Sequence, residues 1–121
     1  MSGLNDVCVV GAACRLPGAP DERTFAEVLA RGSFTVGELP PDRWPPELLF
    51  HPDTRAPGAA YTFAGGYLPA PYNFDIGAFG ISPREAAQMD PQQRLLAELA
   101  WEALEDARIP PDSLAGEEVG V

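Results

Sequence analysis

Lysine is absent from this chain of 121 residues, histidine occurs once and cysteine only twice. All eight basic residues are therefore arginines, and 18 acidic residues outnumber them, which gives a net charge of −10. A chain of this charge repels nucleic-acid phosphates and anionic lipid headgroups, so neither is an expected partner. Two cysteines are too few for a disulfide scaffold.

Long apolar runs are also lacking. A membrane-spanning helix needs about 20 apolar residues, whereas the run from Val7 to Ala13 is short and follows Asp6 directly, unlike a signal peptide. We therefore expect a cytoplasmic protein with reduced thiols. Apolar residues nevertheless make up 45% of the chain, which argues against a disordered tail, and 14 prolines with 12 glycines predict extensive loops.

Regular elements are predicted mainly near the two ends of the chain. The apolar, β-branched run Val7–Val10 is typical of a buried strand ending at Gly11. Asp21 is a good N-cap for a helix that Gly32 ends near Arg31.

The middle of the chain is predicted to be largely irregular. Four prolines within Leu39–Pro46 exclude a regular helix or central strand, and we expect Trp44 to be a buried anchor there. A short hairpin is predicted through Tyr61–Phe63 and Tyr67–Leu68, turning at Gly65-Gly66.

Two Xaa-Pro pairs start helices in the last third. Ser82 precedes a short helix that ends near Met89, and Asp90 precedes the longest helix, which ends near Arg108. Val119–Val121 is typical of the start of another strand. The apolar stripe of the long helix, expected to be mostly buried, consists of Leu95, Leu96, Leu99, Ala103, Leu104 and Ala107.

Several motifs resemble those of polyketide-synthase ketosynthases, and they follow one another in the same order and at the same spacing as in that family. They are Val10-Gly11-Ala12-Ala13-Cys14-Arg15-Leu16-Pro17-Gly18, Pro41-Asp42-Arg43-Trp44, Gly65-Gly66-Tyr67-Leu68, Phe74-Asp75, Phe79-Gly80-Ile81-Ser82-Pro83-Arg84-Glu85-Ala86, Met89-Asp90-Pro91-Gln92-Gln93-Arg94-Leu95-Leu96 and Trp101-Glu102-Ala103-Leu104-Glu105. The resemblance covers about residues 7–121, which we predict to be an incomplete β-ketoacyl synthase N-terminal domain after a leader of residues 1–6. It implies an α/β fold: the N-terminal portion of the first half of a thiolase-like fold, rich in loops and with one long helix.

The resemblance also implies a reaction. A complete ketosynthase catalyses decarboxylative Claisen condensation: a cysteine takes the acyl chain, and two histidines assist the loss of carbon dioxide from a malonyl unit. The partners implied are an acyl carrier protein, whose phosphopantetheine holds the substrates, and a second ketosynthase copy. The family's nucleophile lies in a Thr-Ala-Cys-Ser-Ser type of context, which does not occur in this chain. We therefore predict that the chain alone is inactive and holds no catalytic, cofactor-binding or metal-binding residue.

Some residues suggest other chemistry when taken singly. Cys14 beside Arg15 resembles an activated nucleophile, but no base is identifiable, and a small buried residue is the preferred interpretation. Cys8 is expected in the core of the strand. His51 has no partners for catalysis or metal binding and is expected in a solvated loop.

Acidic residues and glycines have similarly plain explanations. The solvent-exposed face of the long helix is expected to carry Glu98, Glu102 and Glu105, rather than these being a catalytic carboxylate pair. Arg94 and Arg108 lie within reach of them for ion pairing. The glycines fit turns and close packing rather than a phosphate loop; those in question are Gly11, Gly18, Gly65 and Gly66. Trp44, Trp101, Phe74 and Phe79 are expected to be core anchors.

Two alternatives remain open beside the incomplete ketosynthase. One is an autonomous, non-catalytic remnant that binds a carrier protein or another ketosynthase; a stop codon after codon 121 would support it. The other is a carrier protein, because Asp112-Ser113-Leu114 resembles a phosphopantetheine attachment sequence. A phosphopantetheine adduct in the intact mass would support the carrier protein.

Overall fold

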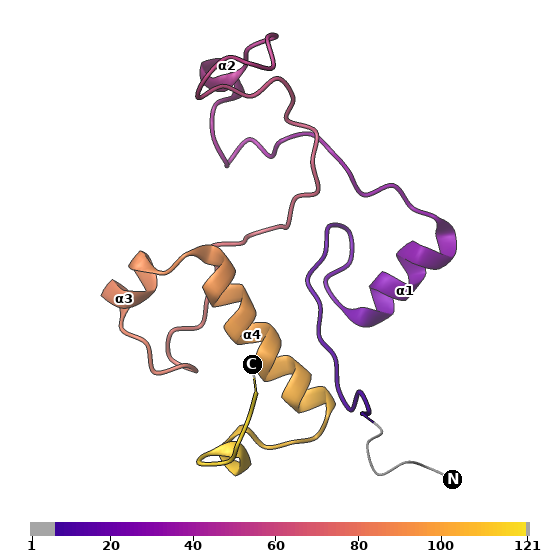
Figure 1. Ribbon diagram of the computed structural model, residues 1–121, viewed down its shortest axis with the longest axis vertical. Coiled ribbons are helices and arrows are strands. Elements are labelled where there is room, and N and C mark those ends of the chain that lie inside the picture. The colour runs from indigo at the N-terminus through magenta and orange to yellow at the C-terminus, as the bar shows by residue number, and fades with distance from the viewer. Residues whose placement is uncertain (1–6, 121) are drawn as a thin grey trace. The chain divides into compact units, whose positions relative to one another are not determined.

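The computed structural model describes residues 7–120, so the predicted leader of residues 1–6 and Val121 lie outside the described residues. Its helices are α1 (Glu22–Arg31), α2 (Pro46–Leu49), α3 (Pro83–Gln88), α4 (Pro91–Asp106) and the 3₁₀ helix η1 (Pro111–Leu114) (Figure 1). The chain divides into two units. One comprises Met1–Arg15 and Ala70–Val121, and the other comprises Leu16–Pro69.

Helix α1 begins and ends where the sequence predicts. The Asp21 side chain accepts a hydrogen bond of 2.7 Å from the Thr24 N–H, which otherwise has no partner in the first turn. Gly32 ends the helix in the left-handed conformation, at φ 60°, a conformation that glycine adopts without steric cost. A residue directly adjacent to each end of α1 therefore fixes where the helix begins and where it ends.

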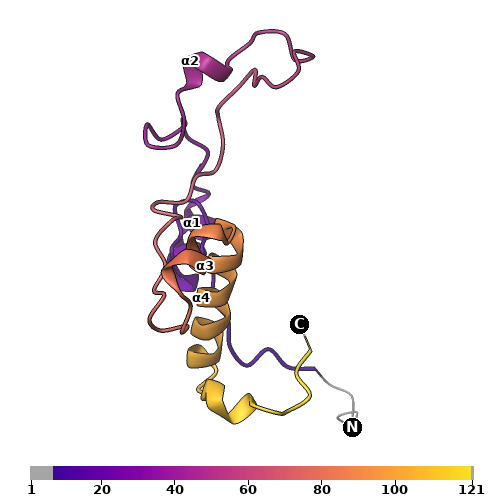
Figure 2. The same ribbon diagram turned by 90° about the vertical axis from the view of Figure 1, so that its left-hand side faces the viewer.

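Helices α3 and α4 also confirm their predicted N-termini. Ser82 Oγ accepts from the Glu85 N–H at 3.2 Å. Asp90 forms a capping box: its Oδ1 accepts from the Gln92 N–H at 2.8 Å, and Gln93 Oε1 accepts from the Asp90 N–H at 3.2 Å. Helix α4 is the longest described element and ends at Asp106, two residues before the predicted limit; η1 follows it after a short connection (Figure 2).

The predicted strand at Val7–Val10 is wrong for the described structure. These residues form no strand, and Val7, Val9 and Val10 are 98%, 89% and 67% exposed; Cys8 is exposed as well, not in a core. A strand needs a hydrogen-bonded neighbour, and within residues 7–120 no segment pairs with this one. Val119 and Gly120 likewise form no strand.

The predicted hairpin is also wrong. Gly65 pairs with Gly37 in an isolated bridge instead of turning Tyr61–Phe63 back onto Tyr67–Leu68. The N–H groups of Gly37 and Gly65 donate to each other's carbonyl oxygens at 2.9 and 3.0 Å. Tyr67 still faces its predicted partner, since its hydroxyl donates to the Phe63 carbonyl at 2.6 Å. The glycine pair therefore joins two loops of the second unit.

Little of the apolar surface is buried. Among the described residues, only Ala19 and Ala86 are buried hydrophobic residues. The prediction of a mostly buried stripe on α4 is wrong, because Leu96 is 64% exposed and Leu99 and Leu104 are only half-buried. Trp44 and Trp101 are exposed too, contrary to their predicted role as core anchors. Helices set by local caps thus carry apolar faces that the described residues leave largely uncovered.

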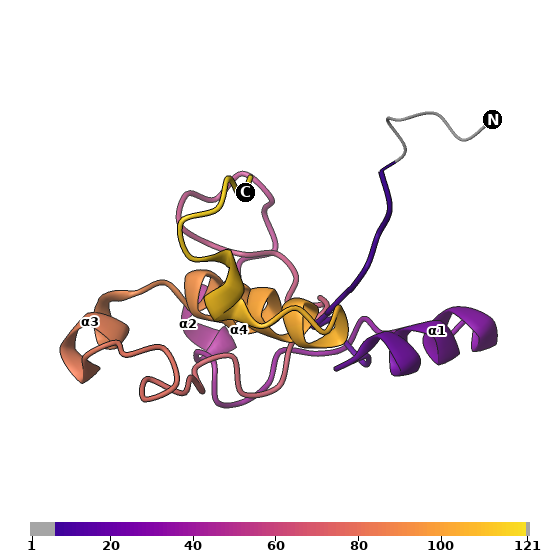
Figure 3. The ribbon, with the colours of Figure 1, turned by 90° about the horizontal axis from the view of Figure 1, so that it is seen from below.

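One close packing contact holds the start of the first unit. Gly11 approaches the last turn of α4, and the next residue, Ala12, donates its N–H to Asp106 Oδ2 at 3.0 Å. From this anchor, residues 7–10 run away from α4 as an extended trace (Figure 3). The prediction that Gly11 serves close packing is confirmed.

Candidate functional site

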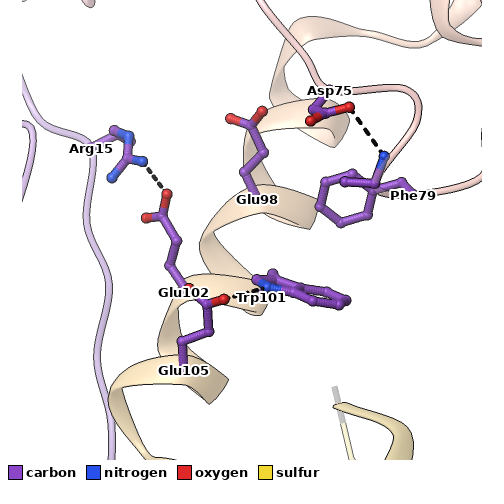
Figure 4. A pocket seen from close by; sticks show the side chains of 8 residues that line it. Arg15, Asp75, Phe79, Glu98, Trp101, Glu102 and Glu105 are labelled. Atoms are coloured by element: carbon purple, nitrogen blue, oxygen red, sulfur yellow. Dashed lines mark hydrogen bonds and ion pairs between the residues drawn. The ribbon is translucent and has the colours of Figure 1, made fainter. Parts of the chain in front are cut away.

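The first unit contains a pocket of about 380 Å³ beside α4 (Figure 4). Its lining combines acidic and aromatic side chains with one arginine. The lining residues are Arg15, Asp75, Ala78, Phe79, Glu98, Trp101, Glu102 and Glu105. Three turns of α4 supply four of them, because Glu98, Trp101, Glu102 and Glu105 recur at spacings of three and four residues.

Two of the carboxylates that line the pocket are bound by neighbouring side chains. Arg15 donates to Glu102 Oε1 in an ion pair between residues 87 positions apart, and it also donates to the Cys14 carbonyl at 3.1 Å. The two paired side chains are 30% and 36% exposed, so solvent screens the pair and its contribution to stability is small. The Trp101 Nε1–H donates to Glu105 Oε1 at 2.8 Å. Glu102 and Glu105 therefore have structural partners.

The aromatic side of the pocket is a short stack. Phe74 and Phe79 stack with ring centroids 5.1 Å apart, and Phe79 meets Trp101 edge to face at 6.0 Å. The loop that carries Phe79 is shaped by Asp75, whose Oδ1 accepts from the N–H groups of Gly77 and Ala78 at 3.0 and 3.1 Å. Phe74 and Phe79, both half-buried, thus come closer to their predicted anchoring role than Trp101 does.

The glutamate row on α4 has partners other than those predicted. Glu102 binds Arg15 and Glu105 binds Trp101, while Arg94 donates to the Tyr72 carbonyl at 3.2 Å. No local sequence signal indicates the Arg15–Glu102 pair, because its partners are distant along the chain. Glu102 and Glu105 thus each accept from a side-chain donor, although neither donor is one of the two arginines that the sequence predicted.

The two cysteines and the single histidine lie at three separate positions in the described chain. Cys14 is half-buried and Cys8 exposed, and neither takes part in a disulfide. His51 belongs to the unit Leu16–Pro69. It is exposed in a loop, as predicted, and its Nδ1 accepts from the Asp53 N–H at 3.1 Å. Within residues 7–120, no group of three or more potential metal ligands comes together.

Ser113 does not have the setting of a phosphopantetheine attachment site. It lies inside η1, a single 3₁₀ turn, and its Oγ donates to the Pro110 carbonyl at 2.6 Å. The carrier-protein serine that Ser113 resembles in sequence begins a helix of a four-helix bundle.

The helices of residues 7–120 include none long and apolar enough to cross a membrane.

The comparisons with known proteins show the family. The family described as beta-ketoacyl synthase, N-terminal domain, matches residues 4–121, and the chain belongs to this family. It is similar to a phenolphthiocerol/phthiocerol polyketide synthase of Mycobacterium tuberculosis, with 51% identity over 116 residues. It is also 50% identical over 125 residues to the pikromycin polyketide synthase component PikAII of Streptomyces venezuelae.

These relatives are far longer than the chain. The matches cover 95% and 98% of this chain, but 8% of the mycobacterial protein and 3% of the pikromycin component. What the chain shares with them is therefore one small part of a much longer protein.

Solved structures agree with this assignment. The ketosynthase domain OzmH KS7 of Streptomyces albus JA3453 matches with a TM-score of 0.80 and 39% identity, over 88% of this chain and 19% of that one. The module 6 ketosynthase of the bacillaene synthase from Bacillus subtilis 168 matches with a TM-score of 0.73 and 29% identity, over 86% and 17%. The chain thus corresponds to part of a thiolase-like fold, to which its described residues contribute helices and loops but no strands.

Proposed function

We propose that this chain forms the N-terminal part of a polyketide-synthase ketosynthase domain, whose complete form catalyses decarboxylative Claisen condensation. The acyl and malonyl units of that reaction are thioesters, the latter on the phosphopantetheine of a carrier protein, and the complete enzyme works as a homodimer. One observation carries the proposal: the backbone matches OzmH KS7 with a TM-score of 0.80 while covering 19% of that domain.

Within such a domain, the role of residues 7–120 is to support the catalytic centre rather than to supply it. The contacts around α4 join side chains to one another: Arg15 to Glu102, Trp101 to Glu105 and Phe79 to Trp101. Cys14 does not have the sequence context of the family's nucleophile. We assign the nucleophile and the histidine pair to the part of a ketosynthase outside these 121 residues.

A graft tests the proposal. Residues 4–121 replace the corresponding segment of OzmH KS7, and the chimera is assayed for malonyl decarboxylation and carbon–carbon bond formation with carrier-bound substrates. We expect activity, because the two backbones match and 39% of the residues are identical. A chimera that carries Cys14→Ala should be as active as its parent.

The controls separate folding from function. The unmodified ketosynthase sets the reference activity, melting temperature and oligomeric state. A chimera that matches the reference in melting temperature and oligomeric state, yet catalyses neither reaction, would contradict the proposal. Loss of activity with Cys14→Ala alone would contradict the assignment of the nucleophile to another part of the domain.

A further inference from the structure

We draw no further inference here: the strongest candidate, the pocket beside α4 whose carboxylates are Asp75, Glu98, Glu102 and Glu105, is a cluster of acidic side chains in which Glu102 and Glu105 already accept from Arg15 and Trp101, and nothing among the described residues shows what would occupy it.

Discussion

Gly11 and Ala107 lie so close together that a β-carbon on Gly11 would sit 2.7 Å from the Cβ of Ala107 and closer still to the carbonyl oxygen of Ala103. Real side chains do not tolerate such distances, so only glycine fits at this position. The contact joins the start of the described chain to the end of its longest helix.

Gly11→Ala should therefore destabilise the grafted ketosynthase by about 1–3 kcal/mol, the usual cost of overpacking. Urea unfolding of the chimera measures the change. Gly37→Ala is the matched control, because a β-carbon there meets nothing within 4 Å, and it should change stability by less than about 0.5 kcal/mol. Equal effects of the two substitutions would show that the packing of Gly11 against α4 is misplaced.

Asp90→Ala should cost helix α4 about 1 kcal/mol, because it removes the side chain of the capping box. Far-UV circular dichroism of the chain should show reduced helicity. Asp90→Ser keeps an oxygen that can accept from the first turn and should retain most of the signal. An alanine variant as helical as the original chain would show that the capping box does not limit this helix.

Leu99→Asp should reduce the helicity of the isolated chain more than Leu96→Asp does. Leu99 is half-buried, whereas Leu96 is 64% exposed, and complete burial of a leucine contributes about 1.5–3 kcal/mol. The two variants have the same charge and the same helix propensity at neighbouring turns. A larger effect at Leu96 would mean that the exposed face of α4 is covered in solution.

The isolated chain should catalyse neither condensation nor malonyl decarboxylation with a carrier-bound substrate. The reason is chemical: no Thr-Ala-Cys context is present, and the single histidine lies in a solvated loop. Turnover that disappears in the Cys14→Ala variant would contradict this prediction and make Cys14 a nucleophile.

The isolated chain should also be marginally folded and prone to associate. Its uncovered segment Val7–Val10 and exposed leucines leave apolar surface that soluble monomers seldom show. We expect oligomers in size-exclusion chromatography, binding of hydrophobic dyes and weak amide protection. A monomeric peak with a sharp cooperative melt would be the opposite result and would favour an autonomous remnant.

The helix starts could be predicted from sequence because their causes are local. Asp21, Ser82 and Asp90 each bind an N–H two or three residues further along the chain, so a short window of sequence contains the whole interaction. Family membership was equally accessible, since the matching motifs are contiguous runs of residues. The absence of catalytic residues stays a prediction, which activity assays of the chain and of the chimera must test.

The sequence-based predictions that proved wrong depend on contacts between residues that are distant along the chain. A strand at Val7–Val10 needs another strand, and burial of Trp44 or Leu96 needs a covering layer; the composition of these residues predicts burial, but the described residues do not provide the cover. The Arg15–Glu102 pair was missed for the same reason, because 87 positions separate its members. Local signals thus predict α1, α3 and α4 but not the short helices α2 and η1, and the distant contacts required a structure.

The local caps have a consequence for synthesis on the ribosome. Helix α4 contains its own start signal, and helices form far faster than the roughly 5–20 residues per second at which a chain is made. Val7–Val10 leaves the ribosome more than 80 residues before α4 does, and until then neither α4 nor its contact with Gly11 is present beside this exposed apolar segment. During that interval it is a short, uncharged, β-branched segment of the kind that chaperones shield, so arrested nascent chains should show chaperone crosslinks at Val9 before α4 emerges.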